Sequence, residues 1–120
     1  MHEIIKKYQD IIQYHQIELW ENEPTTYRFK ARIEFTDRSL LFIRDYLFPR
    51  GRKYVYHWQR EDGTLFVRWD NSPHWKKIAT FPHHKHVDSQ NNVVESTEVF
   101  LDDILDIIRE RFSTTQETQD

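Results

Sequence analysis

The sequence predicts an α+β domain: an antiparallel β-meander of about five strands, with N-terminal and C-terminal helices packed on one face. Three observations support this fold class. Apolar residues recur at helical spacing near both ends, the middle contains alternating or uninterrupted apolar runs separated by turn residues, and a histidine-rich segment without regular pattern follows. A length of 120 residues suits one hydrophobic core. We therefore assign residues 1–112 to a single domain and residues 113–120 to a polar C-terminal tail.

Amphipathic helices are predicted at both ends of this domain. The first covers residues 2–15, and the second covers residues 99–112, with Ser96 or Thr97 as its expected N-cap. The acidic residues of the second helix point outward, and the polar tail after it should fray. The apolar stripes consist of Ile4, Ile5, Tyr8, Ile11 and Ile12 in the first helix, and of Leu101, Ile104, Leu105, Ile108 and Phe112 in the second.

Two strands are predicted over residues 27–35 and 40–48, with the polar residues 36–39 as the turn between them. The first strand alternates between apolar residues on one face and mainly basic residues on the other. The second is apolar on both faces, which suits a strand near the middle of a sheet.

A β-hairpin is predicted over residues 54–71, because Asp62-Gly63 favours a type I′ turn. Taking these two residues as the turn fixes the pairing of the two strands. After the hairpin, residues 71–92 show no regular pattern beyond a short strand over residues 77–81. The predicted pairs are Trp58–Val67 and Tyr56–Trp69 on an aromatic face, and His57–Arg68, followed by Asp70, on an ionisable face.

Charge is unevenly distributed along the chain. Residues 25–86 carry a net charge of +7 and the remaining residues carry −10, although the whole chain carries only −3. A basic middle with acidic flanks indicates a surface that binds a polyanion, and an uneven scatter of solvated charge is the alternative. The chain has no cysteine, no apolar run of the ~20 residues that a membrane span requires, and no signal-peptide pattern. We therefore expect a cytoplasmic protein.

Several motifs follow one another in the second half of the chain: Tyr56-His57-Trp58-Gln59, Arg68-Trp69-Asp70-Asn71, Pro73-His74, and Phe81-Pro82-His83-His84-Lys85-His86. In these motifs, from about Ile17 to Phe112, the chain resembles the TumE family of small prokaryotic toxins from type II toxin-antitoxin modules. One departure is Trp75, where a second histidine is common. The resemblance implies a toxin that arrests growth and is inhibited by a cognate antitoxin, often a helix-turn-helix protein. It implies no established catalytic residues.

The residues themselves favour phosphate chemistry on RNA. Attack of a ribose 2′-hydroxyl on the adjacent phosphate needs a base, an acid and cations, and histidine, arginine and lysine suit these roles. Candidate catalytic residues are His57, Arg68, Asp70, His74, His83, His84, Lys85 and His86, and candidate RNA-binding residues are Arg28, Lys30, Arg32, Trp75, Lys76 and Lys77.

A divalent metal ion is an alternative reason for the histidine-rich segment. In an extended segment His84 and His86 project to one side and His83 to the other, so a third ligand, His74 or Asp70, is required. Lys85 places positive charge beside such an ion, so a divalent metal at His84 and His86 stays an alternative that is not favoured, and we expect no cofactor. A plainer reading is a partly exposed loop in which the histidines cap backbone groups.

Three functions remain open. The first is a toxin acting as a metal-independent endoribonuclease with histidine acid/base catalysis on a basic sheet face. The second is a toxin that transfers a nucleotidyl or other group onto tRNA or protein. The third is a non-enzymatic module that binds RNA or a partner protein. Expected partners are the antitoxin and an RNA substrate, with no membrane, and homodimerisation stays open.

Overall fold

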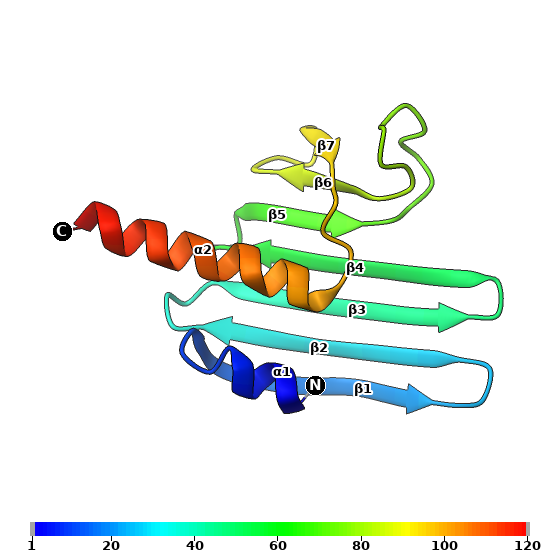
Figure 1. Cartoon of the computed structure of the whole chain (residues 1–120), viewed down its shortest axis with the longest axis horizontal. Helices are drawn as coiled ribbons and strands as arrows, with labels where there is room; N and C mark the ends of the chain where they lie inside the picture. Colours follow the sequence, from blue (N-terminus) through cyan, green and yellow to red (C-terminus); the bar gives the residue numbers. More distant parts are fainter. Residues whose placement is uncertain (1, 120) are drawn as a thin grey trace.

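One antiparallel sheet dominates the fold (Figure 1). The computed structural model describes residues 2–119, with side chains through residue 113. Each strand is hydrogen-bonded to the next one in the chain, which confirms the α+β meander, but the sheet has seven strands rather than about five. The elements are α1 (His2–Lys7), β1 (Ile12–Asn22), β2 (Tyr27–Phe35), β3 (Leu40–Phe48), β4 (Gly51–Gln59), β5 (Leu65–Asp70), β6 (His84–Val87), β7 (Val93–Glu95) and α2 (Leu101–Gln119).

The N-terminal segment contains the first additional strand. The helix predicted over residues 2–15 ends at Lys7, and β1 begins at Ile12. Because β1 pairs with β2 along its whole length, interstrand hydrogen bonding outweighs the helical spacing of the apolar residues. Tyr8 and Ile11, in the turn between α1 and β1, still reach the core.

The histidine-rich segment contains the other two additional strands. β6 pairs with β5, and β7 pairs with β6, at the edge of the sheet opposite β1. The short strand predicted over residues 77–81 is wrong. The chain turns there, because the amide of Ile78 donates to the carbonyl of Trp75 at 3.2 Å and that of Phe81 donates to the carbonyl of Ile78 at 3.0 Å. Backbone donors satisfied within a turn are not available to a neighbouring strand.

The β4–β5 hairpin has the predicted register but a different turn. Trp58 pairs with Val67, and the other predicted pairs are present as well. In the loop, only Gly63 has a positive φ, of 91°, and its amide donates to the carbonyl of Arg60 at 2.9 Å. This is a three-residue loop rather than a type I′ turn, and a β-bulge between Trp58 and Gln59 absorbs the extra residue. The two differences offset each other, so the side chains keep their predicted faces.

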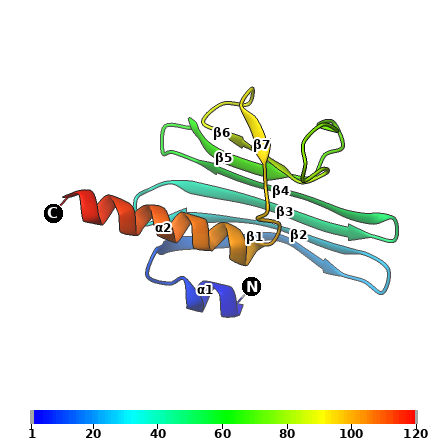
Figure 2. The same ribbon diagram turned by 45° about the horizontal axis from the view of Figure 1, so that its top comes forward.

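The core joins one face of the sheet to the two helices, and α2 crosses the central strands (Figures 1 and 2). The hydroxyl of Tyr8 donates to the carboxylate of Asp106, which ties the start of the chain to α2. We call this the helix face of the sheet and the opposite one, which neither helix covers, the open face (Figure 2). Buried residues of the helix face are Phe29, Ala31, Ile33, Phe35, Leu41, Ile43, Tyr54, Tyr56, Trp58, Phe66 and Trp69.

Helix α2 starts later and ends later than predicted. Asp103 accepts from the amides of Val99 and Phe100, at 3.3 and 3.2 Å, and thus caps the first turn in place of Ser96 or Thr97. No glycine or proline ends the helix at Phe112, and its backbone continues to Gln119. The side chains of the predicted polar tail lie outside the described residues from position 114 onward. Neither helix in the described chain has the length and hydropathy of a membrane-spanning segment.

Candidate functional site

The open face carries most of the charged candidate residues. Strand pairing places Lys30 opposite Arg44, His57 opposite Arg68, and Asp70 opposite His84. Side chains separated by a single strand spacing can act on the same bound group. The open-face residues of β2 to β6 include Arg28, Lys30, Arg32, Phe42, Arg44, Tyr46, Val55, His57, Arg68, Asp70, His84 and His86.

His57 and Arg68 form a hydrogen-bonded pair near the middle of the open face. Nη1 of Arg68 donates to Nδ1 of His57 at 3.3 Å. Burial and, second, the charge of Arg68 lower the pKa of His57 below its ordinary value of 6.5. The imidazole is therefore neutral near pH 7, which is the state that a proton acceptor requires.

A cavity of about 400 Å³ opens beside this pair. Lys30 and Arg44 line it together with His57 and Arg68, and Glu18 adds one carboxylate at the β1 side. Apolar groups complete the wall, so charges inside it are less well solvated than on a flat surface. Such a cavity can hold an anionic group against several cations and one neutral imidazole.

A second polar cluster lies deeper, at the β5–β6 end of the open face. Asp70, His84 and His86 are all buried, with exposed fractions of 6, 1 and 7%. Nε2 of His84 lies 2.9 Å from Oδ1 of Asp70, and Nε2 of His86 lies 3.5 Å from Oδ2. Nε of Arg68 also lies 3.5 Å from that Oδ2, so the carboxylate links this cluster to the cavity beside His57.

The loop after β5 covers this cluster. The indole of Trp75 lies 6.2 Å from the ring of His84 and 6.1 Å from that of His86, yet 40% of Trp75 remains exposed. His74, Lys76 and Lys77 are exposed in the same loop. They lie outside the buried cluster.

His83 and Lys85 point away from these groups. Nδ1 of His83 lies 2.9 Å from the hydroxyl of Tyr54, whose ring belongs to the helix face. The ammonium of Lys85 donates to Glu98 at 2.8 Å. Because neighbouring residues of a strand alternate in direction, Lys85 cannot share a face with His84 and His86. The structure therefore does not bring the whole histidine-rich segment to one place.

The predicted RNA-binding residues of β2 differ in their surroundings. Arg28 pairs with Glu21 at 3.3 Å, and Arg32 donates to Gln16 at 2.9 Å. Lys30, between them, has no hydrogen bond or ion pair with the described side chains and lines the cavity beside His57. Lys30 is thus the β2 cation with the greatest freedom to contact a ligand.

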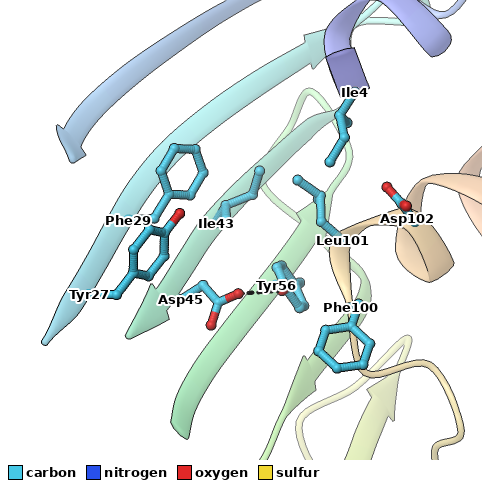
Figure 3. Close-up of a pocket in the computed structure, with 9 residues that line it drawn as sticks. All are labelled: Ile4, Tyr27, Phe29, Ile43, Asp45, Tyr56, Phe100, Leu101 and Asp102. Atoms are coloured by element: carbon cyan, nitrogen blue, oxygen red, sulfur yellow. Dashed lines mark hydrogen bonds between the residues drawn. The ribbon is translucent and has the colours of Figure 1, made fainter. Parts of the chain in front are cut away.

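A further cavity, of about 380 Å³, lies on the helix face between the sheet and the start of α2 (Figure 3). In Figure 3, a dashed line joins Asp45 to Tyr56, and Leu101 and Phe100 lie on either side of this pair. The hydroxyl of Tyr56 donates to Asp45 at 3.2 Å, and Arg52 binds both oxygens of this carboxylate at 2.9 and 3.0 Å. The polar groups of this cavity are therefore largely engaged with one another.

Comparison with known families decides the classification. The family described as Toxin TumE matches residues 1–112, which is most of the chain. The chain belongs to the TumE family. No curated protein and no solved structure matches it.

Membership of the TumE family makes this chain a toxin of a toxin-antitoxin module, with a cognate antitoxin as its partner. The matched residues contain α1, the whole sheet and the packed part of α2. Both the open face and the helix-face cavity therefore lie within the part of the chain that the family shares.

Sequence reasoning missed the Asp45–Arg52 network of this TumE-family chain. Arg52 also donates to the carbonyl of Val99 at 2.8 Å, which fastens the segment before α2 to the sheet. One signal was available: Asp45 follows the apolar residues Leu41 and Ile43 on the same face of β3. A carboxylate on a buried face requires a partner, and that expectation points to a nearby arginine.

Proposed function

We propose that this TumE-family toxin acts on RNA and that it cleaves the phosphodiester backbone in the cavity beside His57. The observation that carries the proposal is the meeting of His57 and Arg68 with Lys30 and Arg44 on a sheet face that no helix covers. Exposed cations along a groove are the general means of holding a nucleic-acid backbone. Trp75, at the edge of the same face, offers a surface on which a base can stack.

The proposed reaction is a metal-independent transfer within RNA. The 2′-oxygen forms a bond to phosphorus, the bond from phosphorus to the 5′-oxygen breaks, and a 2′,3′-cyclic phosphate results. His57 accepts the proton of the 2′-hydroxyl, and a solvent water supplies the proton that the 5′-oxygen takes up. A phosphate that draws Arg68 toward itself leaves Nδ1 of His57 free for this proton, since Arg68 is the donor that occupies it.

Arg68, Arg44 and Lys30 have the role of stabilising charge on phosphorus in this proposal. Arginine donates two parallel hydrogen bonds to phosphate oxygens, and a preformed arrangement of such donors lowers the barrier. Asp70 holds Arg68 from behind at 3.5 Å and is a positioning residue. His84 and His86 are too deeply buried to reach a phosphate, so they act through Asp70.

The decisive experiment compares the chain with its His57→Ala variant on purified mRNA, tRNA and rRNA. The intact chain should yield fragments with 2′,3′-cyclic phosphate and 5′-hydroxyl ends, and His57→Ala should lower the rate by about 100-fold or more. His15→Ala is the matched control, because His15 is exposed on β1 and faces away from the cavity. Absence of cleavage on all three RNAs by folded protein contradicts the proposal.

The same assay separates the two alternative functions. Transfer of a nucleotidyl or other group adds label from a labelled nucleotide to RNA or protein without shortening the RNA. A module that only occupies its target arrests growth without altering RNA ends. In that case His57→Ala weakens growth arrest only as far as it weakens binding, whereas a variant that binds RNA normally and is harmless supports catalysis.

A further inference from the structure

The two buried histidines present the same ring atom to one carboxylate. Nδ1 of His84 lies 3.0 Å from the carbonyl oxygen of Pro82, and Nδ1 of His86 lies 2.9 Å from that of Gln90. A carbonyl oxygen only accepts, so both Nδ1 atoms carry the proton. In the neutral rings, each Nε2 is then a lone pair, and both Nε2 atoms are on the side of Asp70.

The contact between His84 and Asp70 is close without being a hydrogen bond. Nε2 of His84 lies 2.9 Å from Oδ1 of Asp70, yet the atom has no aligned partner within the described residues. Oδ1 already accepts from the amide and the hydroxyl of Ser72, at 3.0 and 2.9 Å. An unpartnered lone pair beside a carboxylate oxygen in a buried site is unfavourable unless a proton or a metal ion lies between them.

From this geometry we propose that Asp70, His84 and His86 bind a divalent transition-metal ion, for which Zn²⁺ is the best match. One ligand atom of each residue lies within 4.8 Å of the others. In tetrahedral Zn²⁺ sites with bonds of about 2.1 Å, ligand atoms are roughly 3.4 Å apart. The 2.9 and 3.5 Å separations from Asp70 are close to this spacing, so small side-chain movements suffice.

The surroundings of the three residues are those of a metal site. Metal-bound imidazoles usually donate their other ring N–H to a backbone carbonyl or carboxylate, as both of these rings do. Two imidazoles and one carboxylate suit Zn²⁺ or a similar first-row ion better than Mg²⁺ or Ca²⁺. Lys85 does not oppose the ion, because its ammonium lies on the other face of β6 and pairs with Glu98.

The ion has a structural consequence. Asp70 ends β5, His84 begins β6, and the loop between them carries Trp75 across both histidine rings. An ion bound by these residues therefore fixes the end of the sheet and the loop in one arrangement. The ion takes no part in the proton transfer assigned to His57.

The test measures metal binding by the tag-free full-length chain without RNA. After removal of metal, the chain should bind one equivalent of Zn²⁺ in competition with a chromophoric chelator. Its thermal midpoint should rise, by roughly 10 °C when free Zn²⁺ exceeds Kd about 100-fold. His86→Gln should lower the affinity at least about 10-fold, because it removes one of three ligands. His83→Gln is the matched control and should bind as the unaltered chain does, since His83 faces Tyr54.

Two results overturn the proposal. One is failure of the folded chain to bind Zn²⁺ or Co²⁺, with an unchanged thermal midpoint, which leaves a buried carboxylate–histidine ion pair. The other is equal affinity of His86→Gln and the unaltered chain. If His86→Gln does not fold, ¹⁵N NMR of the unaltered chain decides, because Zn²⁺ must shift Nε2 of His84 and His86 and leave His83 and His57 unchanged. Zn²⁺ binding without RNA cleavage refutes only the proposed function, and cleavage without Zn²⁺ binding refutes only this site.

Discussion

The two faces of the sheet use similar residues for different purposes. Along β4, Tyr54, Tyr56 and Trp58 are buried on the helix face, whereas Val55 and His57 are only half-buried on the open face. On the helix face, Arg52 is engaged with Asp45, Tyr56 and the carbonyl of Val99. On the open face, Lys30 has no such partner among the described side chains. Charge that is satisfied internally stabilises a fold, and charge without an internal partner remains available to a ligand.

The largest expected difference between the faces is in stability. Trp69→Ala removes a fully buried side chain from the helix face and should lower the free energy of unfolding by about 3–5 kcal/mol. Phe42→Ala, on the open face, removes a ring that is 37% exposed and should cost about 1 kcal/mol or less. Urea denaturation of both variants measures the difference. Equal losses would show that the open face is also part of the core.

Two arginines on neighbouring strands sharpen the comparison. Arg52→Met leaves the half-buried Asp45 carboxylate without its partner and should cost about 2 kcal/mol of unfolding free energy, with RNA affinity unchanged. Arg44→Met should have the opposite profile: stability within about 0.5 kcal/mol and weaker RNA binding, with a salt dependence reduced by about one phosphate contact. Denaturation and binding titrations at several salt concentrations test both. If Arg52→Met loses RNA affinity and Arg44→Met does not, the RNA site lies on the helix face instead.

The smallest expected effect is a shift in pH dependence. The pKa of His57 is below 6.5, so its ring becomes neutral before the pH reaches 6.5. The cleavage rate should therefore rise with pH in the acidic range and reach its plateau near pH 6.5. Arg68→Gln removes the second cause of this low pKa, so the midpoint of the acidic limb should move to higher pH. Burial, the first cause, should still keep the pKa of His57 below 6.5. The rate itself should fall about 100-fold. Profiles of kcat/KM against pH, with Arg38→Gln in an exposed turn as control, measure this shift. An unmoved limb would assign the titration to another group.

Much of this two-faced arrangement was predictable from alternation alone. The period of two in residues 27–35 and the pairing of His57 with Arg68 identified both faces of the central strands. The edges were not predictable in the same way. The helical spacing of apolar residues continues to Ile12, so the start of β1 lay inside the helix predicted over residues 2–15, and its pairing with β2 makes it a strand. β6 and β7 are four and three residues long, too short for a period to be recognised.

For the candidate site too, the direction of side chains was predictable and their burial was not. Sequence reasoning placed His84 and His86 on one side of an extended segment and His83 on the other, and the structure has this arrangement. The depth of the cluster was not predictable, because it depends on a loop that places Trp75 against His84 and His86. The position of Lys85 was not predictable either, because its partner, Glu98, is distant in sequence.

The bulge next to the β4–β5 loop makes this hairpin more sensitive to changes in the length of the loop than to substitutions in it. Gly63 and the bulge after Trp58 together keep β5 in step with β4. Deleting one loop residue while the bulge persists slides β5 by one position, and a slide of one position exchanges the two sides of a strand. Arg68 would then point into the hydrocarbon interior and Trp69 into water. Homologous chains should therefore vary the residues of this loop other than Gly63, while keeping its length.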